Sequence, residues 1–224
     1  MKIISLDNLS QADPDNECFI IKSVFKPVEC EEIIQWISSF LTSVQENEKF
    51  NGENWHYHIL KDGIDFQTFN FYDLKKLGNE KLTHFYKTLF NLYQKFGECS
   101  GLDFETEIAR SNQTGKTINP QTFWYPAGVG KFKWHEHPGD FQRFQLLCNL
   151  TRPNIDYRGG ETLIDMGSSV ETFAADFEQG DVFSFPYTKR HMVNAVEKGS
   201  GDSNRRISLL MPLLPRAGVA GVKY

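Results

Sequence analysis

Two pairs of histidines in this sequence have a spacing that suits metal binding. His56 and His58 form one pair, and His135 and His137 form the other, each with one residue between the two histidines. On a β-strand, residues two apart project to the same side, so the imidazoles of either pair could bind one metal ion. The spacing alone does not separate a metal site from two unrelated histidines, so the surrounding residues carry the argument.

The second pair lies within an ordered series of strand and turn features. In chain order, these features begin with a Tyr-Pro strand and glycine turn (125–134), the pair at 135 and 137, and a buried strand (145–150). A Gly-Gly turn (159–160), a Gly-Asp turn before a Phe-rich strand (180–185), a histidine that opens a strand (191) and an arginine in the last strand (206) follow. The first pair has no comparable surroundings. We therefore expect His56 and His58 in a partly exposed strand or loop near the mouth of a pocket.

This ordered series resembles the 2-oxoglutarate- and Fe(II)-dependent oxygenases, particularly their prolyl 4-hydroxylase-like branch. The resemblance covers residues 120–212. It implies an enzyme that holds Fe(II) by three side chains on one face, which leaves positions free for 2-oxoglutarate and dioxygen. The expected reaction is hydroxylation of an unactivated C–H bond in a small molecule or an amino-acid-like substrate.

The resemblance also implies the metal ligands. In this family the first histidine is followed two residues later by an aspartate, and a second histidine comes from a later strand. Here His135 takes the place of the first histidine, His137 takes the place of the aspartate, and His191 is the later ligand. Neutral imidazoles bind Fe(II), but without the carboxylate the site is one charge unit more positive and also suits Zn, Cu or Ni.

Two other arrangements of the ligands stay open. If His137 is the first ligand, Gly139 occupies the place of the acid, as in 2-oxoglutarate-dependent halogenases, where chloride fills the vacated position. Pro138 opposes this arrangement because it cannot donate a hydrogen bond to a strand neighbour. Alternatively, Asp140 or, less readily, Glu136 supplies a carboxylate. Strand alternation turns Glu136 away from both histidines, so the set of three histidines is the preferred interpretation.

The resemblance assigns three further residues to 2-oxoglutarate. Arg206 is expected to bind its far carboxylate, because a planar guanidinium offers two parallel donors that lysine lacks. Ser208 lies two positions on, projects from the same face of the strand and is expected to donate a second hydrogen bond. Tyr125 lies on the strand that reaches the co-substrate in the family, although a core tyrosine would fit the same position. Arg205 points the opposite way, toward solvent.

Helices come first in the chain and strands follow. One helix begins at Pro27, since proline is tolerated in a first turn, and apolar residues at helical spacing from Leu82 to Phe96 predict a second, ended by Gly97. The β-rich runs after residue 100 are 122–125, 144–150, 161–164, 170–174, 181–185, 192–196 and 206–211. This order predicts an α+β fold. The resemblance makes it a double-stranded β-helix, a cupin-like jelly roll buttressed by N-terminal helices.

Length and composition set the remaining expectations. The 224 residues fit a single domain, 1–224, with helical support at about 27–97 and the jelly-roll core at about 105–212. The net charge of −5 argues against nucleic acid or an anionic membrane as the partner. The start of the chain lacks the features of a secretory signal, and the four scattered cysteines suit free thiols in a reducing cytoplasm.

The expected partners are therefore a small-molecule substrate and dioxygen, with the oligomeric state left open. Three alternatives use the same fold in other ways. One is the halogenase with a vacant carboxylate position, and another is a three-histidine dioxygenase that does not use 2-oxoglutarate. Arg206 and Ser208 argue against the second, because such an enzyme has no evident use for a buried guanidinium. The third is a binding protein that has lost its iron.

Overall fold

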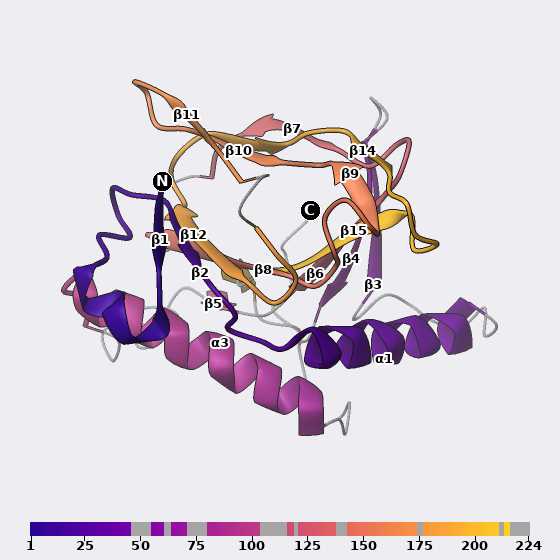
Figure 1. Ribbon diagram of the computed structural model, residues 1–224, viewed down its shortest axis with the longest axis horizontal. Coiled ribbons are helices and arrows are strands. Elements are labelled where there is room, and N and C mark those ends of the chain that lie inside the picture. The colour runs from indigo at the N-terminus through magenta and orange to yellow at the C-terminus, as the bar shows by residue number, and fades with distance from the viewer. Residues whose placement is uncertain are drawn as a thin grey trace.

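The computed structural model of the chain describes residues 1–45, 55–60, 64–70, 80–103, 116–118, 121–137, 143–173, 177–210 and 213–215. Within this part, two larger β-sheets and two long helices form layers (Figure 1). The smaller sheet lies on one side of the larger sheet, and the helices lie on the other side. The larger sheet is therefore covered on both faces.

The larger sheet has eight strands, and its neighbours are antiparallel except for the pair β1–β2. Their order across the sheet is β1 (Lys2–Ile4), β2 (Phe19–Ile21), β12 (Val182–Pro186), β8 (Phe144–Asn149), β15 (Arg205–Leu210), β6 (Gln121–Pro126), β4 (Ile64–Asn70) and β3 (Trp55–Leu60). The strand with the expected guanidinium, β15, lies near the centre, between β8 and β6.

The smaller sheet has four strands. Their order is β11 (Val170–Thr172), β10 (Thr162–Asp165), β13 (His191–Val193) and β7 (Phe132–His135). Two strand pairs complete the described part: β9 (Tyr157–Gly159) with β14 (Val196–Lys198), and β5 (Lys116–Ile118) with β16 (Leu213–Pro215). From β6 onward the chain passes back and forth between the two sheets. This alternation brings strands distant in sequence to face each other.

Two helices cover the outer face of the larger sheet: α1 (Pro27–Gln45) and α3 (Glu80–Cys99); a short 3-10 helix, η1 (Leu6–Gln11), precedes them. The helix α1 begins at Pro27 as predicted, and the Glu29 side chain accepts a hydrogen bond from the backbone N–H of Lys26 at 2.7 Å. Aromatic rings hold the layers together: Phe25 stacks on Phe85 with ring centroids 3.6 Å apart. Both rings are almost fully buried, which stabilises each by about 1.5–3 kcal/mol.

The central strand β8 is buried on both faces, including its polar residues Gln145 and Asn149. Leu146 and Cys148 pack into the core beneath the helices, whereas Leu147 packs with Phe183 and Phe185 between the two sheets. Successive residues of a strand point to opposite faces, so a strand covered on both faces buries every side chain. All six residues of β8 are buried.

The sequence predictions for the β-rich half are largely confirmed. Each of the seven predicted runs contains a strand, and His191 opens β13. The run 192–196 divides into β13 and β14, since the backbone N–H of Asn194 bonds instead to the carbonyl of Glu161. The hairpin of β3 and β4 was not predicted as a pair of strands of the larger sheet, where the two strands form one edge.

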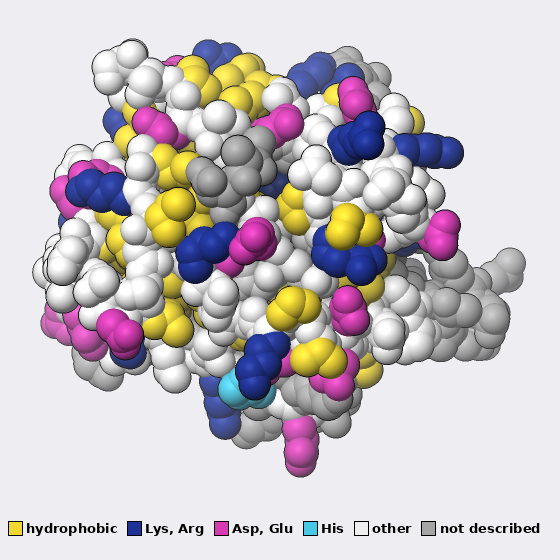
Figure 2. Space-filling view, in the orientation of Figure 1, with side chains coloured by type: hydrophobic (Ala, Val, Ile, Leu, Met, Phe, Trp, Pro, Cys, Tyr) yellow, Lys and Arg dark blue, Asp and Glu magenta, His cyan; other side chains and the backbone are white. Residues whose placement is uncertain are grey.

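Three general expectations can be compared with the described residues. The four cysteines are free thiols as predicted, and three of them are buried. None of the described helices combines the length and the apolar character that crossing a membrane would require. Lys, Arg, Asp and Glu side chains are interspersed on the face of the molecule in Figure 2, with no large area of one sign.

Candidate metal centre

Two of the predicted histidines lie opposite each other on adjoining strands. His135 of β7 pairs with His191 of β13, and their ring centroids are 4.2 Å apart. The next pair, Val193 with Phe132, shows that β7 contains one extra residue, as at a β-bulge. The extra residue turns both Phe132 and His135 toward the space between the sheets, where Phe132 lies 3.9 Å from the His135 ring.

His137 joins these two rings just beyond the end of β7. Its ring centroid lies 5.0 Å from that of His135 and 5.2 Å from that of His191. One ring nitrogen of each histidine lies within 4.8 Å of those of the other two. Three neutral nitrogen donors this close together, on one side of an open space, can bind a single transition-metal ion.

Hydrogen bonds select the tautomer of two of these rings. The Nδ1 atom of His135 lies 2.8 Å from the carbonyl oxygen of Lys133, and Nδ1 of His191 lies 2.7 Å from that of Lys189. A carbonyl oxygen only accepts, so Nδ1 carries the proton in both rings. The lone pair is then on Nε2, which is free to bind a metal. Metal-binding histidines are commonly oriented by such a second hydrogen bond.

Burial keeps all three imidazoles uncharged at neutral pH. It lowers the pKa of His191 to about 3 and that of His137 to about 4, with a smaller contribution from the neighbouring histidines. Burial also lowers the pKa of His135, against the hydrogen bond to Lys133. The neutral rings therefore keep their lone pairs available, as metal ligands must.

Among the described residues, no carboxylate belongs to the group of three histidines. Glu136 is exposed, in agreement with the strand alternation that turns it away from its neighbours. Gly139 and Asp140, on which the two other ligand arrangements depend, lie outside the described residues, as does Pro138.

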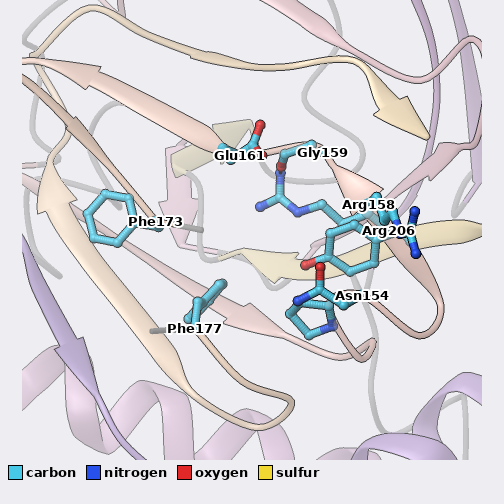
Figure 3. Close-up of a pocket in the computed structure, with 10 residues that line it drawn as sticks. Asn154, Arg158, Gly159, Glu161, Phe173, Phe177 and Arg206 are labelled. Carbon is cyan, nitrogen blue, oxygen red and sulfur yellow. Dashed lines mark hydrogen bonds between the residues drawn. The ribbon is translucent and has the colours of Figure 1, made fainter. Parts of the chain in front are cut away.

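Arg206 is buried in the space between the sheets. Only 2% of it is exposed, whereas Arg205 is exposed on the other face, as predicted. The guanidinium donates to the carbonyl oxygen of Gly160 at 2.7 Å and to Thr162 Oγ1 at 2.9 Å. Figure 3 shows the Arg206 side chain reaching into a pocket toward Glu161. A buried cation with two of its five N–H groups held by the protein has donors left for a carboxylate.

Ser208 provides an unused hydrogen-bonding group on the same strand. It is completely buried, and its Oγ atom has no hydrogen-bond partner among the described residues. A buried hydroxyl without a partner costs about 1–3 kcal/mol. Since Ser208 follows Arg206 by two residues, both side chains leave the strand on the same face. The pair therefore suits an anionic ligand that would satisfy the hydroxyl.

A continuous series of packed side chains connects Arg206 to the histidines. The guanidinium lies over the ring of Tyr125, 5.6 Å from its centre, and Tyr125 is 3% exposed. Tyr125 belongs to one apolar cluster with Val193 and Phe132, and Phe132 contacts His135. Burial raises the pKa of Tyr125, which keeps its hydroxyl protonated. The guanidinium and the imidazoles therefore border the same interior.

Sequence reasoning missed several residues that shape this interior. Thr162 holds the guanidinium, and Asn194 donates to the Glu161 carboxylate at 3.1 Å. Glu161 lines the pocket beside Arg206, together with Phe173. The sequence predicted a turn at 159–160 and a strand at 161–164, but it assigned no role in the site to Glu161 or Thr162.

The backbone at Gly160, beside Arg206, leaves no room for a side chain, and a substitution to alanine tests this. Its φ is +65°, and a Cβ atom would lie 2.8 Å from Val196 Cγ2 and 3.4 Å from Arg206 Cδ. We expect Gly160→Ala to lower the free energy of unfolding by roughly 2–4 kcal/mol, from backbone strain plus overlap. Gly167→Ala is the matched control, because Gly167 has φ +88° with no atom within 4 Å, and it should cost only about 1–2 kcal/mol. Urea unfolding measures both, and equal losses would contradict the crowding argument.

The remaining histidines lie elsewhere. His56 and His58 are in β3, at the edge of the larger sheet, with β4 and β6 between that strand and β15. His84 is an exposed residue of α3, 3.8 Å from the Glu29 carboxylate. That His56 and His58 take no part in the metal centre stays a prediction, because their side chains lie outside the described part of the structure.

Comparison with known proteins gives matches to solved structures. No family model matches the sequence, and no curated protein matches it. A Trichoplax adhaerens prolyl hydroxylase, solved with a hypoxia-inducible factor peptide, is similar with a TM-score of 0.65 and 14% identity, covering 96% of this chain and 94% of that one. A Pseudomonas putida prolyl-4-hydroxylase has a TM-score of 0.62 and 12% identity over 94% and 96%.

A third similar structure is that of an epimerase, whereas the first two are prolyl hydroxylases. A non-haem alpha-ketoglutarate-dependent epimerase from nogalamycin biosynthesis has a TM-score of 0.58 and 11% identity, covering 96% of this chain and 87% of that one. At these identities the similarity shows a shared fold. The chain therefore shares with these solved structures a mostly β fold with a few helices, in agreement with the fold class predicted from the sequence. The neighbours include a hydroxylase and an epimerase, so the fold leaves the reaction open.

Proposed function

We propose that this chain is a 2-oxoglutarate- and Fe(II)-dependent oxygenase, built as one domain over residues 1–224. The two sheets are those of a double-stranded β-helix. Strands β6, β15, β8 and β12 belong to one sheet, and β7, β13, β10 and β11 belong to the sheet that faces it (Figure 1). Among these eight strands the chain alternates between the sheets except at the β10–β11 hairpin. This is the order that a jelly roll requires.

One observation carries the proposal: three neutral imidazoles converge in the interior that also contains a buried guanidinium. Their nitrogens lie within 4.8 Å of one another, and hydrogen bonds leave Nε2 of His135 and His191 available. His135, His137 and His191 would hold Fe(II) on one face. The opposite side would stay free for 2-oxoglutarate and dioxygen.

The residues around the metal centre have distinct tasks. Arg206 would bind the far carboxylate of 2-oxoglutarate through its free N–H groups, and the Ser208 hydroxyl would donate to the same carboxylate. Tyr125 walls the site beside the guanidinium. Phe132 and Phe185, next to His135 and His191, exclude water from the ligands. Binding at a dry, charged site orients the co-substrate before dioxygen arrives.

When bound, the iron and its co-substrate supply an oxidation in which dioxygen gives one oxygen atom to each of two products. In that oxidation 2-oxoglutarate would lose carbon dioxide and gain one oxygen atom to become succinate, and the other oxygen atom would enter a substrate C–H bond to form an alcohol. We propose hydroxylation of a small molecule or an amino-acid-like substrate. The four free thiols support a cytoplasmic location.

Anaerobic addition of Fe(II) and 2-oxoglutarate tests the proposal. We expect the weak visible charge-transfer band of an iron-bound keto acid, and succinate formation once oxygen is admitted. His191→Ala should abolish both, because it removes a ligand. His84→Ala is the control, since His84 is exposed on α3, and it should change neither. A wild-type protein that shows no band and forms no succinate would refute the assignment.

A further inference from the structure

His137 is held differently from the other two histidines of the candidate metal centre. His135 and His191 each donate a ring hydrogen bond to a backbone carbonyl. Among the described residues, the His137 ring has no hydrogen bond and instead lies flat on the ring of Tyr187. The two rings are 4.2 Å apart between centroids and inclined by only 7°.

Tyr187 is itself firmly placed. It follows β12 directly, and its backbone N–H donates to the carbonyl oxygen of Arg143 at 2.9 Å. Its side chain packs against the apolar cluster between the sheets, which includes Phe183 and Phe185. Burial raises the pKa of Tyr187, so the ring stays neutral. It forms a fixed, uncharged surface beside His137.

We propose that Tyr187 is a positioning residue that orients His137 for metal binding, an inference that rests on the proposed function. The stack fixes the plane of the His137 imidazole. The ring can then change its orientation only by a half-turn that exchanges its two faces. The stack takes the place of the backbone hydrogen bonds that orient the other two ligands. The stacked residue, His137, occupies the position of the usual aspartate. It lies beyond the end of β7 and has no strand partner among the described residues.

The expected effect follows from the freedom that the stack removes. Immobilising one side chain at a binding site typically changes affinity by about 3- to 10-fold. We expect Tyr187→Leu to weaken Co(II) binding by about that factor, measured by calorimetry on metal-free protein. The visible spectrum of bound Co(II) should also change, because one ligand is less ordered. Tyr187→Phe keeps the ring and should restore both properties.

Phe132→Leu is the matched control. Phe132 also contacts a ligand ring, at 3.9 Å, but that ring belongs to His135, which the carbonyl of Lys133 holds independently. Its loss should weaken Co(II) binding less than the loss of Tyr187. Tyr187→Met is the second variant, which fills the space without an aromatic face, in case Tyr187→Leu does not fold.

A second measurement does not need the metal. In the metal-free protein, the ring protons of His137 should shift in the NMR spectrum of Tyr187→Leu, because they lose the ring current of Tyr187. Unchanged His137 shifts would overturn the stack, and unchanged Co(II) affinity and spectrum would overturn the positioning role. If wild-type protein binds no Co(II), the metal centre itself fails and this inference with it. That result differs from one in which the wild type binds Co(II) and the Tyr187 variant binds it with the same affinity, which would refute only the positioning role.

Discussion

Replacing Arg206 with lysine should weaken 2-oxoglutarate binding by about 30- to 150-fold while leaving metal affinity within about twofold. The guanidinium is buried, and it is held by Gly160 and Thr162 at 2.7 and 2.9 Å. A lysine keeps the charge but cannot present two parallel donors to a carboxylate. Breaking a buried, hydrogen-bonded charge pair costs about 2–5 kcal/mol, and the retained charge places the lysine variant in the lower part of that range.

Arg205→Lys is the matched control for this prediction. Arg205 is the adjacent residue, but it is exposed, and its guanidinium lies 5.6 Å from the centre of a ring of Trp124. Titration of the Fe(II)-loaded proteins with 2-oxoglutarate, without oxygen, measures the affinity. The Arg205 variant should match the wild type. Equal affinities in the Arg206 and Arg205 variants would show that the co-substrate, if bound, does not use the buried guanidinium.

The sequence was most informative where burial constrains both faces of a strand. The run 144–150 was predicted to be a buried strand, and β8 confirms this with every residue buried, Gln145 and Asn149 included. The adjacent arginines were separated in the same way, since strand alternation turns Arg206 inward and Arg205 outward. Such patterns follow from local geometry, so the sequence alone reveals them.

Contacts between segments that are distant in the sequence could not be predicted from such local patterns. Thr162, whose hydroxyl accepts a hydrogen bond from Arg206, is 44 residues from Arg206 in the sequence. Tyr187, whose ring stacks on His137, is 50 residues from His137. No periodicity connects such positions, because the contact depends on the crossing of chains between two sheets. The extra residue in β7 is also invisible in the sequence, since nothing in Phe132–His135 marks a bulge.

Among the described residues the candidate metal centre offers three imidazoles and no carboxylate, and this changes which metal ions it should prefer. Three neutral imidazoles leave the full charge of the ion in place, whereas an aspartate would remove one unit. Imidazole ligands suit Zn, Cu and Ni as well as Fe(II), and carboxylate ligands favour harder ions such as Mn(II). The preference for one ion over another therefore depends on the side chain at position 137.

Restoring the carboxylate at this position provides the sharpest test of the ligand arrangement. We expect His137→Asp to bind Fe(II) as tightly as the wild type or more tightly, and to lose affinity for Ni(II) relative to Mn(II). His137→Ala should weaken Fe(II) binding by more than the roughly 10- to 100-fold that changes in outer-shell partners cost, because it removes a ligand. Anaerobic competition between the metals measures these affinities.

Glu136→Gln separates the effect of coordination from that of charge. Glu136 adjoins His137 but is exposed and outside the group of three nitrogens, so its neutralisation changes the nearby charge without changing a ligand. It should leave the metal preference unaltered. If His137→Asp instead weakens Fe(II) binding as much as His137→Ala, an imidazole is required at this position. His137 would then be the first ligand of the sequence series, and the acid position would pass to Gly139, as in the halogenases.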